Sequence, residues 1–274
     1  GRLLVGAFEL ELEQRLDALG AEAGPDVRLT TDAMVQTAPS IAWNGSGFGV
    51  AWQDTRDGNV EIYFMPIAAD GTAAGAEIRV TADPATSNSP FLAWSGSGYG
   101  LAFYDNRAGS NVWFARLAPD GAKVGSEVEV STGPTTSEDP FLSWTGSEFV
   151  AVWEDGRHID REIYLARVSA DGAVVGTEIR VTDAPGDSMF PAMAWTGSRL
   201  GLAWQDERDG NDETYFAFLS PEGTRLGPDL RVTVDAAISD FPWIAWSGSS
   251  FGLVWEDLRA GNPEIYFNMV MPCD

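Results

Sequence analysis

Residues 52–64 of the chain read WQDTRDGNVEIYF, and the same pattern returns four more times. The later copies are FYDNRAGSNVWF at 103–114, WEDGRHIDREIYL at 153–165, WQDERDGNDETYF at 204–216 and WEDLRAGNPEIYF at 255–267. Nine residues before each copy stands a tryptophan that is followed by a small polar residue, Gly and Ser: Trp43, Trp94, Trp144, Trp195 and Trp246. The chain is therefore built from five repeats of 50 or 51 residues, which is the signature of a repeat architecture.

Each repeat alternates apolar and polar or small residues with a period of two, which predicts β-strands. Four strands fit one unit: strand A as at 90–94, strand B as at 99–105, strand C as at 62–64, and strand D as at 77–81. Turns such as Asp70-Gly71 separate strands C and D. A single four-stranded sheet cannot bury both of its faces, so sheets repeated at this period are expected to pack radially on one another as a β-propeller.

The predicted fold class is therefore all-β, a five-bladed β-propeller with four antiparallel strands per blade, in a single domain over 1–274. The repeats fall near 31–81, 82–131, 132–182, 183–233 and 234–274, and the last repeat ends after strand C. Residues 26–30, DVRLT, match strand D, so we expect them to pair with 264–270 and close the ring, which removes an exposed edge. Residues 1–25 are expected to add an outer strand at 8–16 and a turn at 17–24.

Composition excludes several classes of function. The chain carries 17 Lys and Arg against 41 Asp and Glu, a formal charge of −24, which disfavours nucleic acid and anionic membranes as partners. No apolar run approaches the roughly 18 residues of a membrane helix. Cys273 is the single cysteine, so an internal disulfide is impossible. The start at Gly1 lacks the features of a signal peptide, so we expect either a cytoplasmic protein or one whose leader has been removed.

The repeat resembles a known family. It carries a Pro before strand A, an x-Gly-Ser turn, the run D-x-R-x-G-N-x-E-I-Y, and an Asp-Gly turn. In these features it resembles the bacterial WD40-like repeat of TolB-type propeller proteins, and it is also similar to sialidase-like repeat proteins, although the sialidase Asp-box S-x-D-x-G-x-T-W is absent. The resemblance implies a bacterial protein of the periplasm, the cell surface or the medium, and it transfers no catalytic residue.

The most regular polar feature is an Asp-x-Arg pair at the end of every strand B. The pairs are Asp54 and Arg56, Asp105 and Arg107, Asp155 and Arg157, Asp206 and Arg208, and Asp257 and Arg259. A chemical step needs different groups in different roles, whereas this pair recurs in all five repeats, so we interpret it as a structural fork between carboxylate and guanidinium. The alternatives are five equivalent lectin pockets or loops that bind Ca²⁺.

Candidate functional residues are those that break the repeat on the face formed by the loops between strands B and C and between strands D and A. The candidate binding residues are Tyr104, Glu138, Asp139, His158, Phe190, Phe241 and Trp243. They combine carboxylates and a lone histidine with aromatic surface, a mixture typical of a selective pocket. Carboxylate pairs such as Glu154 with Glu256, or Glu138 with Asp139, have the residue types that glycoside hydrolysis requires.

The sequence therefore predicts an exported, non-enzymatic module that binds a carbohydrate, peptide or protein at the mouth of the central channel. Two alternatives remain open: a glycoside hydrolase that uses carboxylates at the channel mouth, and a multivalent lectin. No nucleophile elbow, metal cluster or phosphate loop is present in the sequence, so no catalytic residue is assigned. No cofactor is certain, and Ca²⁺ is possible.

Overall fold

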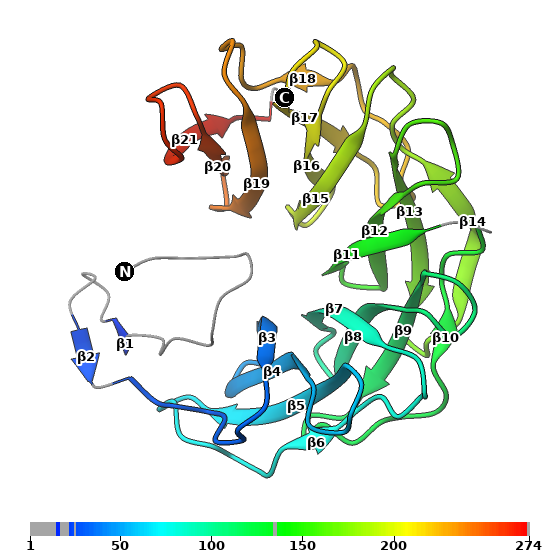
Figure 1. Cartoon of the computed structure of the whole chain (residues 1–274), viewed down its shortest axis with the longest axis vertical. Coiled ribbons are helices and arrows are strands. Elements are labelled where there is room, and N and C mark those ends of the chain that lie inside the picture. Colours follow the sequence, from blue (N-terminus) through cyan, green and yellow to red (C-terminus); the bar gives the residue numbers. More distant parts are fainter. Residues whose placement is uncertain (1–14, 17–21, 25, 134–135, 273–274) are drawn as a thin grey trace.

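A computed structural model of the chain describes residues 15–16, 22–24, 26–133 and 136–272. Five antiparallel sheets radiate from a common centre, which confirms the prediction of an all-β, five-bladed propeller (Figure 1). The first strand of each sheet lies at the centre and the later strands lie progressively outward. We number the sheets as blades 1 to 5 in chain order. The described residues include no helix long and apolar enough to cross a membrane.

The blades follow the predicted strand order A, B, C and D. Blade 1 contains β3 (Gln36–Trp43), β4 (Gly47–Asp54), β5 (Glu61–Ala68) and β6 (Ile78–Arg79). Blade 2 contains β7 (Ser87–Trp94), β8 (Tyr99–Asp105), β9 (Asn111–Leu117) and β10 (Val128–Glu129). Blade 3 contains β11 (Ser137–Trp144), β12 (Glu148–Asp155), β13 (Glu162–Ser169) and β14 (Val174–Arg180). Blade 4 contains β15 (Ser188–Trp195), β16 (Leu200–Asp206), β17 (Glu213–Leu219) and β18 (Leu230–Arg231). Blade 5 contains β19 (Ser239–Trp246), β20 (Phe251–Asp257) and β21 (Glu264–Val270).

The hydrophobic core is a series of layers between successive blades. Large side chains of strands B and C, such as Trp153, Phe114 and Phe216, are fully buried there. Glycines in strand B leave room for the aromatic ring of the next blade: a Cβ at Gly100 would lie 2.6 Å from a ring carbon of Phe149. Each layer buries an apolar sheet face that one blade alone would expose to water, so the layers hold the blades at fixed positions around the centre.

The structure differs from the expected arrangement at the junction of blades 5 and 1. Blade 5 has three strands, and residues 26–30 form no strand and do not pair with β21. Leu29 instead packs on the apolar cluster of blade 1 that contains Trp52 and Tyr63, which holds this segment at the opposite end of the arc. The ring is consequently open between blades 5 and 1 (Figure 1).

The N-terminal region also departs from expectation. The outer strand predicted for 8–16 lies almost entirely outside the described residues. Its last two residues form β1 (Arg15–Leu16), which pairs with β2 (Glu22–Gly24) in a separate two-stranded sheet rather than with a blade.

Candidate functional site

Every central strand carries a bulge at the same repeat position. Pairing of strand A with strand B shifts register there, and the bulged residue has a positive φ of 46° to 49° although it is never glycine. The five residues are Ala38, Ser89, Asp139, Phe190 and Phe241. A left-handed backbone at a non-glycine residue costs of order 1–3 kcal/mol, and such bulges re-aim side chains next to functional sites. The repeat thus places five variable side chains around the centre of the ring.

Contacts between different blades confirm that these side chains converge. The Ser89 hydroxyl of blade 2 donates to the Asp139 carboxylate of blade 3 at 2.9 Å. The rings of Phe190 and Phe241, from blades 4 and 5, lie 4.5 Å apart between centroids. One side of the centre is therefore polar and acidic, and the other is aromatic.

An aromatic cluster lies two residues further along strand A. The Phe91 and Phe141 ring centroids are 3.9 Å apart, and Trp243 lies 5.8 Å from Phe141 and 6.4 Å from Phe91. Trp243, one of the predicted binding residues, belongs to this cluster. The three rings come from blades 2, 3 and 5, so the cluster joins these blades at the centre of the ring.

Two glutamates of blade 3 face each other at the site. Glu138 on β11 is directly opposite Glu154 on β12, so both side chains lie on the same face of the sheet. The Glu154 side chain is 4% exposed, and its carboxylate accepts from Arg161 Nη1 at 2.7 Å and from the backbone N–H of Phe190 at 3.4 Å. Burial and the negative charge of Asp139 raise the pKa of Glu154 to about 7, although the Arg161 charge opposes that rise.

Tyr104 of blade 2 completes this acidic group. Burial, followed by the charges of Asp139 and Glu138, raises the pKa of Tyr104 to about 12. The phenol therefore remains protonated at neutral pH and can donate a hydrogen bond. Glu138 also accepts a hydrogen bond from the Ser110 hydroxyl at 3.2 Å.

Blade 5 repeats the like-charge arrangement. Asp240 on β19 lies directly opposite Glu256 on β20, at the positions that Glu138 and Glu154 occupy in blade 3. Burial and the neighbouring Glu256 charge raise the pKa of Asp240 to about 6.

Blade 4 contributes a neutral acceptor at the equivalent position. Gln205 is 5% exposed and lies in register between Met189 and Thr214. Within the described chain, neither Gln205 Oε1 nor Thr214 Oγ1 has a hydrogen-bond partner. A buried acceptor without a donor is costly, so this position suits a water or a ligand hydroxyl.

His158 does not join the acidic group. Its Nε2 lies 2.7 Å from the Tyr164 hydroxyl, in the loop between β12 and β13. The same tyrosine position in blades 1 and 4 donates to Asp57 and Asp209. His158 thus replaces a loop aspartate as the partner of a framework tyrosine.

The five Asp-x-Arg pairs form one repeated framework unit. In blade 3 the Asp155 carboxylate accepts from Arg157 Nε and Nη2 at 2.7 Å each and from Trp153 Nε1 at 3.0 Å, while the guanidinium lies 4.1 Å from the centroid of the Tyr164 ring. Burial alone would raise the pKa of Asp155, but these hydrogen bonds outweigh it and lower the pKa. All five aspartates are fully buried, which leaves them inaccessible as lectin pockets.

Metal binding finds no support in the described residues. Within 15–16, 22–24, 26–133 and 136–272, no group of three or more His, Cys, Asp or Glu side chains could hold a metal ion.

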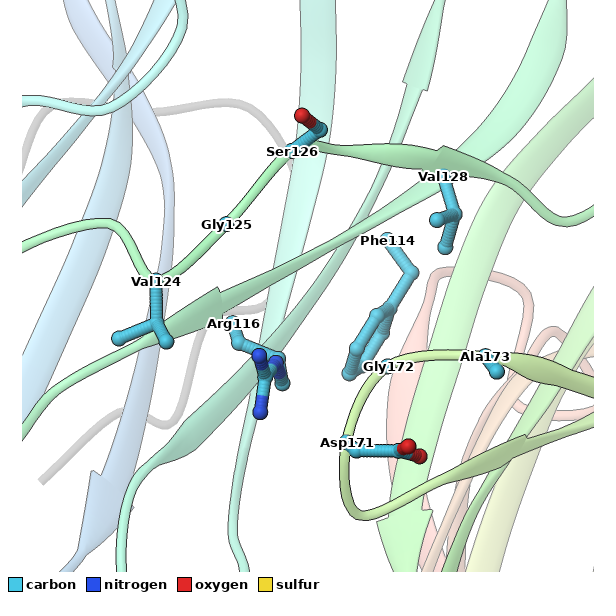
Figure 2. A pocket seen from close by; sticks show the side chains of 9 residues that line it. All are labelled: Phe114, Arg116, Val124, Gly125, Ser126, Val128, Asp171, Gly172 and Ala173. Carbon is cyan, nitrogen blue, oxygen red and sulfur yellow. The ribbon is translucent and has the colours of Figure 1, made fainter.

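A separate hollow of about 290 Å³ lies on the rim between blades 2 and 3 (Figure 2). Its lining includes Phe114 and Arg116 of β9, Val128 of β10, and the turn that contains Asp171 and Gly172. A Cβ at Gly172 would come within 3.2 Å of the Arg116 side chain, so the turn is seated closely on the preceding blade. Asp171 is the one acidic residue in the lining, so this hollow lacks the paired carboxylates of the central site. It lies where one blade packs on the next.

Three residues of this site were not among the candidate binding residues: Ser89, Arg161 and Gln205. Glu154 was noted as a possible partner of Glu256, whereas the structure pairs it with Glu138. The sequence feature that could have identified Arg161 and Glu154 is their departure from the repeat, because both replace neutral residues found at the same positions in blade 2. Their contact could not be recognised before the path of the loop was known.

No protein-family model and no curated protein matches this chain. Solved structures share its fold. An endo-arabinase from Bacteroides thetaiotaomicron is 12% identical, with 86% of this chain and 94% of that chain covered and a TM-score of 0.53. The catalytic domain of a Coprinopsis cinerea GH62 alpha-L-arabinofuranosidase is 10% identical, with coverages of 89% and 92% and a TM-score of 0.51. The hemagglutinin-neuraminidase ectodomain of parainfluenza virus 5 is 8% identical, with coverages of 88% and 71% and a TM-score of 0.56.

These comparisons correct the functional prediction. We expected a non-enzymatic binding module for a carbohydrate, peptide or protein, and that prediction is wrong by this comparison. The neighbours carry the names of glycoside-active enzymes and thus favour the stated alternative. At this identity the likeness establishes the fold, and the sialidase-like half of the predicted resemblance agrees with it. A peptide or protein ligand finds no support, and activity has to be argued from the site itself.

Proposed function

We propose that the protein is a glycoside hydrolase whose active site lies at the centre of the ring, on blades 2 to 5. The observation that carries this proposal is a buried carboxyl group, Glu154, whose pKa is raised to about 7 in part by the charge of a second carboxylate, Asp139. Glycosidases need one carboxylic acid that is protonated near neutral pH and one carboxylate that is ionised, and unequal environments separate the two roles.

Glu154 is the proposed general acid. It donates its proton to the glycosidic oxygen while the bond between that oxygen and the anomeric carbon breaks. Arg161 and the Phe190 N–H hold the carboxyl group in place through hydrogen bonds to its two oxygens. After proton transfer these donors also stabilise the carboxylate that forms.

Asp139 is the proposed second carboxylate. It acts either as the nucleophile, giving a glycosyl–enzyme ester that water then hydrolyses, or as the base that takes a proton from the attacking water. The Ser89 hydroxyl fixes one of its oxygens at 2.9 Å. The anomeric configuration of the first product, measured by NMR, distinguishes retention from inversion and hence the two roles.

The remaining residues suit a sugar ligand. The Phe190 and Phe241 rings offer an apolar surface for the face of a sugar ring, and Tyr104 supplies a protonated donor. Gln205 Oε1 is a buried acceptor that a sugar hydroxyl can satisfy. Because the chain carries a formal charge of −24, neutral glycans are favoured over polyanionic ones. The names of two structural neighbours make arabinose-containing glycans the first substrates to test.

The test is a panel of chromogenic glycosides and plant polysaccharides assayed with wild-type protein, Glu154→Gln and the matched control Glu222→Gln. Glu222 lies on an exposed turn between blade strands, so its substitution should leave turnover unchanged. We expect Glu154→Gln to lower kcat by at least about 100-fold on substrates with poor leaving groups. Turnover that survives Glu154→Gln would refute the assignment. A panel without turnover, together with specific binding on a glycan array, would favour the lectin alternative.

We also propose that the protein works in the periplasm, at the cell surface or in the medium of a bacterium. The support is the similarity of its repeat to the WD40-like repeat of TolB-type proteins. Immunodetection in fractionated cells of its source tests this location, and a signal confined to the cytoplasm would overturn it.

A further inference from the structure

The two ends of the open ring expose the two halves of an interface that is buried everywhere else. On β21, Ile265 is 68% exposed and Phe267 is 61% exposed. The equivalent residues of blades 1 to 4 are all buried: Ile62, Val112, Ile163 and Thr214, and Phe64, Phe114, Leu165 and Phe216. On β3 of blade 1, Ile41 is 46% exposed, whereas its equivalents Leu92, Leu142, Met193 and Ile244 are buried. Exposed apolar surface of this kind marks a place where something docks.

Residues 26–30 already occupy half of that missing interface. In blades 1 and 3 the apolar residue of strand D, Val80 or Val181, belongs to the same cluster as the strand B aromatic of the next blade, Phe103 or Trp204. Leu29 stands at this repeat position and packs on the cluster of Trp52, the strand B aromatic of blade 1. The segment is thus seated on blade 1 as a strand D of blade 5 would be.

Two charged groups lack the partner that the other blades supply. In blades 1 to 4 the framework arginine reaches a second carboxylate on strand D; the pairs are Arg56 with Glu77, Arg107 with Glu127, Arg157 with Glu178, and Arg208 with Asp229. Arg259 of blade 5 forms a salt bridge with Asp257 alone among the described residues. The repeat puts Asp26 at the missing position, and Asp26 Oδ1 is buried without a hydrogen-bond partner in the described structure.

A third contact is half formed. In blade 1, Arg79 Nε donates to the Thr81 carbonyl at 2.8 Å, and Arg79 Nη2 contacts the Glu61 carboxylate at 2.8 Å. In the segment 26–30, Arg28 Nε donates to the Thr30 carbonyl at 2.7 Å, so the local geometry is the same. The residue equivalent to Glu61 is Glu264, which is exposed at the start of β21.

We infer that residues 26–30 are the docking partner of β21, and that the ring closes when β21 pairs with this segment as its fourth strand. The register copies that of blade 1, where Tyr63 pairs with Arg79 and Phe64 with Ile78. Tyr266 therefore pairs with Arg28, and Phe267 with Val27. Asp26 then meets Arg259, and Arg28 meets Glu264. A hollow of about 260 Å³ beside Arg259 and Tyr266 adjoins this edge in the open form.

Closure also completes the central site. At two bulges the backbone N–H donates to the strand B side chain of the preceding blade: Ser89 donates to Gln53 Oε1 at 3.2 Å, and Phe190 donates to Glu154 Oε2 at 3.4 Å. In the closed ring the Ala38 N–H takes this place opposite Glu256. The pair Asp240 and Glu256 thereby gains a backbone donor from blade 1.

Disulfide trapping tests the register in the full chain, with Cys273→Ser to remove the native thiol. The pair Val27→Cys and Phe267→Cys should oxidise to a monomeric disulfide, because paired residues lie within bonding range. In the control, Val27→Cys with Met269→Cys, the second cysteine is two residues out of register on the same strand and should stay reduced. Equal oxidation of both pairs, or no oxidation of either, would overturn the closure. A disulfide-linked dimer at micromolar concentration would show that the segment pairs with a second copy and would also overturn it.

Thermal melting supplies a readout that is independent of catalysis. Asp26→Asn should lower Tm by several degrees, as should the matched change Asp229→Asn in blade 4. If the ring stays open, Asp26→Asn replaces a carboxylate that has no cationic partner, and Tm should stay unchanged or rise. That result for Asp26→Asn, together with a lower Tm for Asp229→Asn, would contradict the closure.

Discussion

Glu138 on β11 lies directly opposite Glu154 on β12, on one face of blade 3. Like charges in this position destabilise a sheet, and the conflict is reduced when one of the two carboxyl groups holds a proton. Burial raises the pKa of Glu154 to about 7, and the negative charges of Asp139 and, to a lesser degree, Glu138 add to that rise. One pair of strands, β11 and β12, thus carries both the proposed acid, Glu154, and the proposed second carboxylate, Asp139.

Stability should depend on pH through Glu154. Because the pKa rises from 4.5 to about 7 on folding, the folded state binds the proton more tightly, and the stabilisation is present below pH 4.5 and lost as pH rises through 7. The shift corresponds to about 3 kcal/mol in the free energy of unfolding. Urea unfolding between pH 4 and 8 should show this decline in wild type and a flatter profile in Glu154→Gln. Parallel profiles would contradict the assignment.

Asp139 should set the acidity of Glu154. Asp139→Asn removes a negative charge that raises the pKa of Glu154, so the Glu154 carboxyl should titrate at lower pH by carbon NMR. Hydrolysis should fall by at least about 100-fold, since the second carboxylate is lost. The exposed turn residue Asp171 gives the control Asp171→Asn. If both variants leave the Glu154 titration unmoved, Asp139 does not act on it.

The framework arginines should matter for folding rather than for binding. Arg208 contacts Asp206 through Nε at 2.7 Å and Asp229 through Nη1 at 2.9 Å, and it lies over the Tyr215 ring. Arg208→Ala leaves the buried Asp206 unpaired and should cost about 2–4 kcal/mol in urea unfolding. Arg199→Ala, which removes only a distant ring contact, should cost far less. A stable Arg208→Ala variant that has lost sugar binding would restore the five-pocket hypothesis.

The joints between blades should resist any side chain at Gly121. Its φ is +89°, and a Cβ there would lie 2.3 Å from Cδ1 of Phe64 in the preceding blade. Gly146 has a similar φ of +94°, but open space surrounds its Cβ position. Gly146→Ala should therefore cost about 1 kcal/mol for backbone strain, and Gly121→Ala about 2–4 kcal/mol because overpacking is added. Equal melting temperatures of the two variants would show that the turn can move off Phe64.

Substitutions at Phe241 and at Trp243 should change different properties of the protein, substrate binding in the first case and stability in the second. Phe241 is exposed beside Phe190, so Phe241→Ala should raise KM about 10-fold with little change in Tm. Trp243 packs on Phe91 and Phe141, so Trp243→Ala should lower the free energy of unfolding by about 3–5 kcal/mol. Measured KM and Tm for both variants check this division. A Trp243→Ala protein of full stability would mean that the central cluster is not part of the core.

The fold could be predicted from the sequence because its signal is a repeat of 50 or 51 residues. That signal does not depend on the correct assignment of any single strand. Strand A was expected at 90–94 and is observed at Ser87–Trp94. Strand D was expected at 77–81, but only Ile78–Arg79 form strand pairing. At Thr81 the side-chain hydroxyl, rather than a backbone carbonyl, accepts the hydrogen bond from the Ile62 N–H, so the ladder ends before that residue.

The site was less accessible to sequence reasoning. The bulge between Glu138 and Phe141 changes which residues of strands A and B lie opposite each other, and alternation alone does not reveal it. His158 was a candidate because it is the one histidine of the sequence, but its ring forms a hydrogen bond with the Tyr164 hydroxyl. A buried phenol needs a hydrogen-bond partner, and the loop between β12 and β13 supplies this one. Arg161 reaches Glu154 only through the folded path of its loop.

The left-handed bulges have a consequence for protein engineering. Ala38 and Asp139 share one backbone conformation although their side chains have nothing chemical in common. Side chains can therefore be exchanged among the five bulges without rebuilding a loop. Transplanting the acidic set at 138, 139 and 154 onto the equivalent positions 37, 38 and 53 would install a second reactive centre, rotated about the ring axis, on the same scaffold.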